Sequence, residues 1–408
     1  MSVVADRVSA AAFLVAYTLD VADEMKLSDD SPTLRSYPER MRARPRAARR
    51  IAEIFRAMGS ARVRKGEMSI NRRNNLGLSL ALSLVLLLGT LPAARAELLS
   101  HRGHPMPRTW PIAAHLTPRF LTRVFGGRDL WPCFSPDGRW VMFSRMSESR
   151  TWELVRVPAS GGAAEKLGLP PALMAATRPS WSPAGNLIAF SGVSAPGRAE
   201  TWIASVDGAD AHPLSGAGLS DQMFYPSWYP DGNRLAAMDG RSLVIKRFDR
   251  TGGGVVALTD HATVLAGRPS VSPDGKWIAF AGQRNAGQVY EQEQNVIWLI
   301  GADGVPRTVE ANPIQGRSPA WSPDGARIAF ESDRGSDVGS YAVFVMGRDG
   351  TGLIQITDYD LNATHPAWSP DGHRIAFDAR DPRLPATFGI AIIDAPDPAS
   401  IHAPISAP

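Results

Sequence analysis

Short apolar segments alternate with polar turns along most of this chain, and the alternation recurs at a nearly fixed interval. Each repeat contains an apolar run, a turn close to Ser-Pro-Asp-Gly, and a second apolar run close to Ile-Ala-Phe. The turn prolines stand at 136, 183, 230, 273, 323 and 370, so that the steps are 47, 47, 43, 50 and 47 residues. A period in this range predicts a repeat architecture.

Each repeat is predicted to fold as four short antiparallel strands. In the turn, proline presets φ, aspartate bonds its own backbone, and glycine accepts a positive φ, which is the chemistry of a hairpin. A third apolar strand follows Ile-Ala-Phe, and a fourth carries Leu-Thr or Ile-Thr, as at Leu258-Thr259 and Ile356-Thr357. Four strands in each repeat are typical of a β-propeller blade. The sequence therefore predicts an all-β fold, a six-bladed β-propeller over residues 119–394.

The last repeat is predicted to take its fourth strand from the other end of the propeller. Only three strands precede the Pro-rich tail at 395–408, and such a tail is a poor strand. The segment "RFLTRVF" at 119–125 contains Leu121-Thr122, in the same register to the next proline as Leu258-Thr259. We predict that 119–125 completes the sixth blade, because pairing the two ends removes an exposed sheet edge.

The recurring pattern Pro-x-Trp-Ser-Pro-Asp-Gly-x-x-Ile-Ala-Phe resembles the TolB-type β-propeller repeat over about 119–394. The resemblance implies a propeller in the bacterial envelope with a protein partner, as TolB-type propellers have in the peptidoglycan-associated lipoprotein. TolB proteins carry a mixed α/β domain before their propeller, whereas only the short segment 97–118 separates the expected leader from the repeats here. The chain therefore resembles the propeller without that domain, and a full Tol–Pal role does not follow from the resemblance.

The region before the propeller is predicted to direct export. Arg72 and Arg73 precede an apolar run at 76–91, and Ala94-Arg95-Ala96 offers small residues for cleavage, so that 68–96 is typical of a signal peptide. An uncleaved anchor is the alternative, although the run is short for a membrane span. The Arg-rich segment 1–67 does not fit in front of a signal peptide, and we expect it to be untranslated or disordered. We expect 97–118 to be flexible, with a three-histidine metal site (His101, His104, His115) as an open alternative.

Charge and cysteine content narrow the class of protein further. Residues 1–96 contain 16 Lys+Arg and 9 Asp+Glu, whereas 97–408 contain 28 and 31, a net charge of −3. That balance does not favour nucleic-acid binding. Cys133 is the only cysteine, and its equivalents in other repeats are serine or alanine, which indicates a packing position. We expect a monomeric, periplasmic or secreted protein with no stable membrane span after cleavage.

The candidate site consists of residues that differ between repeats. The sequence contains no nucleophile elbow, zinc-protease motif, Cys-x-x-Cys, phosphate loop or calcium loop, and we predict no catalytic residue, metal ligand or cofactor. Six of these residues stand directly before the first proline of a repeat, and they are Trp131, Arg178, Tyr225, Arg268, Ser318 and His365. Two more, Phe224 and Arg317, stand one position earlier in their repeats. If the strand before the turn is innermost, these side chains gather at one mouth of the central channel. Aromatic residues and arginine are the usual binding hot spots, and arginine holds carboxylates; simple plugging of the channel is the alternative.

These patterns lead to two functional hypotheses. The first is an exported, non-catalytic propeller that binds a protein or peptide at its channel mouth, with a Tol–Pal-like envelope system as one setting. The second is a periplasmic lyase or hydrolase of acidic oligosaccharides, since the resemblance extends to propeller lyases, in which Arg178, Arg268 and His365 would bind uronate carboxylates. The insertion "RNAGQVYEQEQNV" at 284–296 is expected to be a solvated hairpin, with a partner contact through Tyr290 as the alternative.

Overall fold

The computed structural model describes residues 116–146, 151–287, 290, 294–301, 303–309, 315–336, 340–384 and 386–397. Two compact units divide the chain, Met1–Pro105 and Met106–Pro408, and every described residue belongs to the second. The predictions for the leader 1–67, the signal peptide 68–96 and the three histidines therefore lie outside the described residues. So do most of 97–118 and of the tail. Among the described residues, no helix meets the length and apolarity that a membrane crossing requires.

The strands follow the predicted repeat. The first three repeats contain β3 (Arg128–Phe134), β4 (Trp140–Met146), β5 (Trp152–Pro158), β6 (Glu165–Lys166), β7 (Ala175–Trp181), β8 (Leu187–Ala195), β9 (Arg198–Ser205), β10 (His212–Pro213), β11 (Met223–Trp228), β12 (Arg234–Asp239), β13 (Val244–Asp249) and β14 (Val256–Ala257). The next three contain β15 (Val264–Val271), β16 (Ile278–Arg284), β17 (Val296–Ile300), β18 (Arg307–Thr308), β19 (Arg317–Trp321), β20 (Arg327–Ser332), β21 (Ala342–Gly347), β22 (Ile354–Gln355), β23 (Thr364–Trp368), β24 (Arg374–Arg380) and β25 (Thr387–Asp394). The N-terminal segment adds β1 (Arg119–Phe120) and β2 (Val124–Phe125), and a short 3-10 helix, η3 (Tyr359–Leu361), precedes β23.

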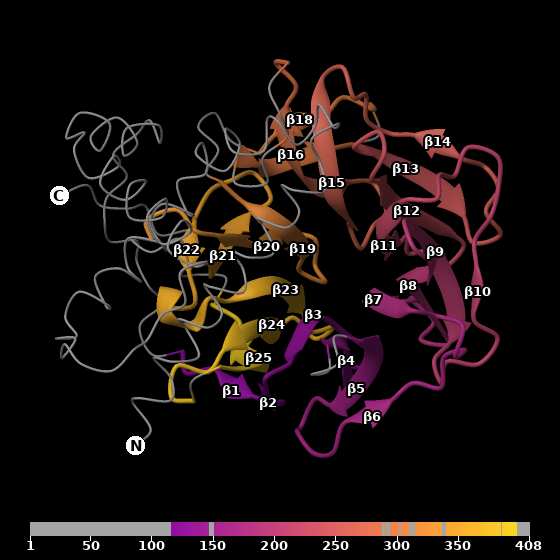
Figure 1. Cartoon of the computed structure of the whole chain (residues 1–408). Coiled ribbons are helices and arrows are strands. Elements are labelled where there is room, and N and C mark those ends of the chain that lie inside the picture. The colour runs from indigo at the N-terminus through magenta and orange to yellow at the C-terminus, as the bar shows by residue number, and fades with distance from the viewer. Residues whose placement is uncertain are drawn as a thin grey trace, which may run out of the picture. The chain divides into compact units, whose positions relative to one another are not determined.

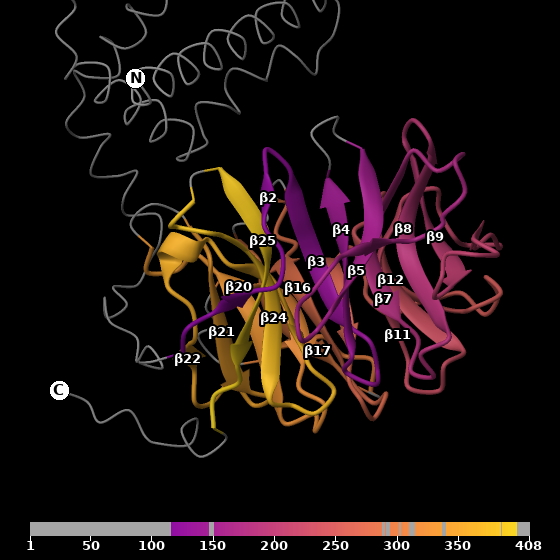
Figure 2. The same cartoon turned by 90° about the horizontal axis from the view of Figure 1, so that it is seen from below.

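The strands form a β-propeller, with antiparallel sheets arranged around an axis that Figure 1 views end-on and Figure 2 from the side. Hydrogen bonding gives three four-stranded sheets, one five-stranded sheet and one eight-stranded sheet. The eight-stranded sheet consists of β3–β6 and β7–β10, joined by the single parallel pair Trp152 and Ala175. Hydrogen bonding alone therefore gives five sheets. The count of six blades stays a prediction.

The first strand of each repeat is the innermost. Contacts run from β3 to β7, and then through β11, β15, β19 and β23 back to β3. The Ser-Pro-Asp-Gly turns leave these strands as predicted. In the first repeat the Gly138 N–H donates to the Ser135 carbonyl at 2.9 Å, and Gly138 has a φ of +70°. This geometry suits a hairpin turn in which glycine takes the left-handed position.

A β-bulge interrupts each innermost strand at the residue before its proline. The six residues Trp131, Arg178, Tyr225, Arg268, Ser318 and His365 all have a φ between +51° and +58°. The register of each first strand shifts across this residue and the proline that follows it. Proline cannot donate to a ladder and is tolerated in a strand at such a bulge. Two residues therefore face one residue of the second strand, and the left-handed side chain is redirected.

The amide N–H of the bulged residue is bound by the neighbouring repeat. The acceptor stands eight positions after the turn proline, on the second strand of the preceding repeat. Four such bonds are present: Arg178 N–H to Ser144 Oγ (3.0 Å), Tyr225 N–H to Ser191 Oγ (3.2 Å), His365 N–H to Glu331 Oε2 (2.7 Å) and Trp131 N–H to Asp378 Oδ1 (3.0 Å). The remaining two positions hold Met238 and Ala281, whose side chains offer no oxygen. The bond from Trp131 to Asp378 joins the first repeat to the last.

The large core side chains lie directly behind the bulges. In five repeats a phenylalanine of the second strand faces the bulge, and it is fully buried at Phe143, Phe190, Phe280, Phe330 and Phe377; in the third repeat Ala237 takes this place. Phe190 and Phe280 stack on the third-strand residues Trp202 and Trp298. Cys133 packs at the edge of an apolar cluster, as predicted for a packing position. Each hydrophobic cluster combines residues of two neighbouring repeats, so that the bulges lie against a core that adjacent repeats share.

The N-terminal segment completes the last sheet, as predicted. Both β1 and β2 pair with β25. The side-chain oxygen of Thr122 accepts the Ile390 N–H at 2.9 Å, as Thr259 does for Ile245 and Thr357 for Val343. The expected single strand at 119–125 is divided in two, because the N–H groups of Leu121 and Thr122 both donate to the Ile390 carbonyl. Gly389 permits this approach, since a Cβ there would lie 2.0 Å from the Thr122 carbonyl oxygen.

The Thr122→Val substitution should show whether the chain ends are as firmly joined as an internal strand. It removes the acceptor of a buried N–H and a 2.6 Å bond to Asp129 Oδ2. We expect a loss of about 1–3 kcal/mol in the free energy of unfolding, measured by urea denaturation. Thr259→Val, which removes the equivalent bond inside one repeat, is the matched control. A loss in the control without a loss in Thr122→Val would contradict the closure.

The Ser191→Ala substitution tests the bond between neighbouring repeats. It leaves the N–H of the left-handed Tyr225 without its side-chain acceptor, and we expect unfolding to become easier by about 1–3 kcal/mol. Ser160→Ala is the control, because Ser160 is exposed and its hydroxyl donates to the Gly161 carbonyl at 3.5 Å, while the bond from Arg119 to the Ser160 backbone carbonyl is kept. Equal unfolding midpoints for both variants and the parent chain would show that the bond adds nothing to stability.

Candidate functional site

The structure brings all eight predicted site residues together around the axis. We refer to them as the axial cluster: Trp131, Arg178, Phe224, Tyr225, Arg268, Arg317, Ser318 and His365. Six of them are the left-handed residues of the bulges, and Phe224 and Arg317 precede two of these. The shared bulge explains the convergence, since it turns one side chain of every innermost strand in the same way.

An arginine enclosed by aromatic rings forms one half of the axial cluster. The Cζ atom of Arg178 lies 4.4 Å from the ring centroid of Trp131 and 4.4 Å from that of Tyr225. The ring of Phe224 lies 5.6 Å from the same atom. Cation–π attraction favours this arrangement and is strongest where water is excluded. The Arg178 Nη1 group also donates to Thr177 Oγ1 at 3.0 Å.

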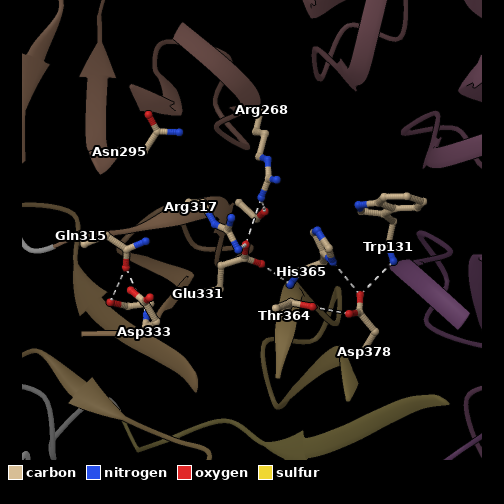
Figure 3. A network of polar contacts seen from close by, with 12 residues as sticks. Trp131, Arg268, Asn295, Gln315, Arg317, Glu331, Asp333, Thr364, His365 and Asp378 are labelled. Atoms are coloured by element: carbon tan, nitrogen blue, oxygen red, sulfur yellow. Dashed lines mark hydrogen bonds and ion pairs between the residues drawn. The ribbon is translucent and has the colours of Figure 1, made fainter. Parts of the chain in front are cut away.

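A buried carboxylate organises the other half. The side chain of Glu331 is fully buried, and its Oε1 lies 3.0 Å from Arg268 Nη1 and 2.9 Å from Arg317 Nη2. Its Oε2 accepts the His365 N–H, and Arg268 also donates to Ser318 Oγ at 2.7 Å. Figure 3 shows these side chains converging on Glu331. A buried carboxylate with several charge-assisted bonds of this kind is well compensated.

A second carboxylate holds the histidine. Asp378 Oδ1 accepts from His365 Nδ1 at 2.8 Å and from the Trp131 N–H at 3.0 Å, and Oδ2 accepts from Thr364 (Figure 3). Because the carboxylate accepts at Nδ1, the other ring nitrogen of a neutral His365 is an acceptor. The His365 and Trp131 rings are 5.4 Å apart. Direct contacts and Glu331 thus link five of the bulge residues in a closed circle, and Ser318 joins it through Arg268.

The charges of the cluster shift two pKa values strongly. Burial acts to raise the pKa of Glu331, but Arg317, His365 and Arg268 prevail and lower it from 4.5 to about 2. Burial also opposes ionisation of Tyr225, yet Arg268, Arg178 and His365 lower its pKa from 10.0 to about 7. A phenol that ionises near neutral pH is uncommon and marks a strongly positive environment.

The sequence did not single out Glu331 and Asp378. Both stand eight positions after a turn proline, where the other repeats hold Ser144, Ser191, Met238 and Ala281. The variation at this position was the available signal, because a side chain that only fills the core would tend to recur. The sequence could not show that the position faces the bulge of the next repeat.

The insertion of the fourth repeat reaches toward the axial cluster through one residue. Tyr290 is half-buried, and its phenol oxygen accepts from Asn295 Nδ2 at 2.9 Å. The same oxygen lies 3.8 Å from where a Cβ on Gly267 would stand, next to Arg268. This contact differs from the fully solvated hairpin that was expected. The partner contact through Tyr290 stays a prediction.

A cavity lies apart from the axial cluster. It has a volume of about 470 Å³ and is lined by residues of the first turn, the end of β5 and the start of β24, including Trp140, Pro158 and Arg374. Across the described ranges, no three His, Cys, Asp or Glu side chains are grouped so as to hold a metal ion. The axial cluster is therefore the candidate site.

Comparisons with known proteins match at the level of the fold. No family model matches the chain, and no curated protein does. Among solved structures, the putative TolB from Agrobacterium tumefaciens is 20% identical with a TM-score of 0.52, covering 68% of this chain and 94% of that one. TolB from Acinetobacter baumannii is 17% identical with a TM-score of 0.47, over 66% and 64%. An oligogalacturonate lyase from Vibrio parahaemolyticus is 13% identical with a TM-score of 0.46, over 71% and 96%.

The likeness to the Agrobacterium protein agrees with the resemblance that the repeat pattern indicates. At this identity the likeness establishes the fold and leaves activity and ligand undetermined. The described part of this chain is an all-β propeller, similar in fold to the putative TolB from Agrobacterium tumefaciens.

Proposed function

We propose that this chain is an exported, non-catalytic propeller that binds a protein or peptide segment at the axial cluster, which forms the mouth of its channel. The predicted signal peptide at 68–96 supports export to the periplasm or beyond. We further infer a monomer that acts in the cell envelope, with a Tol–Pal-like system as one setting.

We also infer six blades. The contacts of β3, β7, β11, β15, β19 and β23 form one closed circuit, and each of these strands carries the same left-handed bulge. The eight-stranded sheet then counts as two blades, because only the pair Trp152 and Ala175 joins its halves.

One observation carries the binding proposal: equivalent positions of all six repeats present unlike side chains through the same unfavourable backbone geometry. A left-handed conformation at a non-glycine residue costs energy and persists only where the surroundings enforce it. Residues that merely hold the repeat together would recur, as the Ile-Ala-Phe phenylalanine does in five repeats. The unlike set contains tryptophan, tyrosine and arginine, the residue types that dominate binding energy at interfaces.

The sequence also suggested a lyase or hydrolase of acidic oligosaccharides. Such an enzyme would use the same positive cluster, with Arg178, Arg268 and His365 as its binding groups. No contact in the described part of the chain favours this hypothesis over peptide binding. Incubating the purified chain with pectic fragments tests it, since a lyase forms unsaturated products that absorb ultraviolet light.

Trp131→Ala should weaken partner binding. Trp131 contacts both Arg178 and His365, so that removing its ring opens both halves of the cluster. We expect the parent chain to capture a defined protein from envelope extract, identified by mass spectrometry, and the variant to bind it at least about 10-fold more weakly.

Trp140→Ala is the matched control for this experiment. The Trp140 ring also contacts an arginine, with Arg156 Cζ at 4.7 Å, but it lies outside the axial cluster. The control should bind the captured protein as the parent chain does. Equal binding by Trp131→Ala and the parent chain would overturn the proposed function.

A further inference from the structure

The two carboxylates that contact the axial cluster, Glu331 and Asp378, are already occupied by internal partners. Glu331 binds Arg268, Arg317 and the backbone of His365, while Asp378 binds the His365 ring and the backbone of Trp131. Both are almost fully buried. These contacts involve two of the three arginines of the cluster, Arg268 and Arg317.

Arg178 carries a charge that no carboxylate balances in the part of the chain that the structure describes. Its polar contacts there are to two hydroxyl groups, those of Thr177 and Tyr225, and aromatic rings enclose it. The cluster thus holds three guanidinium groups against two carboxylates. A desolvated arginine is normally paired with an acceptor of opposite charge, because removing a charge from water is costly.

Two buried donors in contacting side chains also have no acceptor among the described residues. They are the Nε group of Arg178 and the indole Nε1 group of Trp131. Buried donors in folded proteins are almost always satisfied, by protein, water or ligand. The two side chains touch, with 4.4 Å from Arg178 Cζ to the Trp131 ring centroid, so that both donors belong to neighbouring side chains of the aromatic half.

We infer that the partner group that enters the axial cluster is a carboxylate of an acidic peptide segment, bound by the guanidinium of Arg178 with the indole N–H of Trp131 as a second donor. This inference rests on the proposed function and specifies its ligand. Arginine suits the role, since its planar fork binds both oxygens of a carboxylate. A ligand carboxylate would balance the third guanidinium.

Tyr225 makes this binding dependent on pH. Its ring lies between Arg178 on β7 and Arg268 on β15, and the protonated form of His365 on β23 would also favour its ionisation. Glu331 and Asp378, which bind Arg268 and His365, are the negative groups of the same surroundings. Below its pKa of about 7 the phenol is neutral and Arg178 is available. Above it the phenolate competes with a ligand carboxylate, so that binding weakens as the pH rises.

The test uses the full chain and two probes of nearly equal shape, N-acetylglutamate amide and N-acetylglutamine amide. Phenolate absorbance follows the ionisation of Tyr225, and Tyr225→Phe identifies its contribution. We expect the glutamate probe to raise the Tyr225 midpoint and to bind about 10-fold more weakly well above that midpoint than well below it, because coupling between two sites is reciprocal. The glutamine probe and chloride at equal ionic strength should change nothing.

Arg178→Met should remove the effect of the glutamate probe. Arg156→Met is the matched control, since Arg156 also lies over a tryptophan, Trp140, but outside the cluster; it should respond as the parent chain does. An equal effect of the glutamine probe, no effect of the glutamate probe, or an unchanged response in Arg178→Met would overturn the inference. Galacturonate serves as a third probe, because it carries its carboxylate on a sugar. A stronger response to galacturonate than to the glutamate probe would overturn the peptide assignment.

The outcomes also separate this inference from the proposed function. If Trp131→Ala loses the captured protein while the glutamate probe has no effect, the carboxylate inference fails and the binding function stands. If Trp131→Ala captures the protein as well as the parent chain does, the binding function fails whatever the probes show.

Discussion

A left-handed residue followed by proline, placed in the innermost strand of each repeat, is the constraint on which the rest of this structure depends. The conformation is unfavourable for residues such as tryptophan or tyrosine, and proline cannot donate a ladder hydrogen bond. Together they force a bulge, and the bulge has two consequences. One side chain of each innermost strand turns toward the axis, and its N–H leaves the sheet and needs an acceptor elsewhere.

The acceptor comes from the neighbouring repeat, which couples site geometry to the assembly of the propeller. Ser144 and Ser191 only hold a backbone N–H, whereas Glu331 and Asp378 also bind side chains of the cluster. The same two carboxylates thus join repeats and neutralise charge at the axis. Such buried charges are costly unless fully bonded, which explains why each has several partners.

The split of the axial cluster into an aromatic and an ionic half follows from this arrangement. Repeats five and six contribute the carboxylates Glu331 and Asp378, so that Arg268, Arg317 and His365 are bound internally. The early repeats contribute serine at the same position, and Arg178 is enclosed by rings instead. Tyr225 lies at the boundary between the halves, where two arginines make its phenol easier to ionise.

The sequence by itself determined the propeller, its strand order, the hairpin turns, and the closing role of 119–125. These features depend on local chemistry and on periodicity, which a single chain displays directly: the Thr122 bond to Ile390 repeats the bond of Thr259 to Ile245. The sequence also indicated the eight residues of the axial cluster, because they stand at equivalent places in different repeats. Only the tertiary structure decided how those side chains are paired. Glu331 lies 14 residues from Arg317 but 63 from Arg268, and Asp378 lies 247 from Trp131. Contacts of that kind arise between neighbouring repeats around a closed ring, and no local pattern in the chain encodes them.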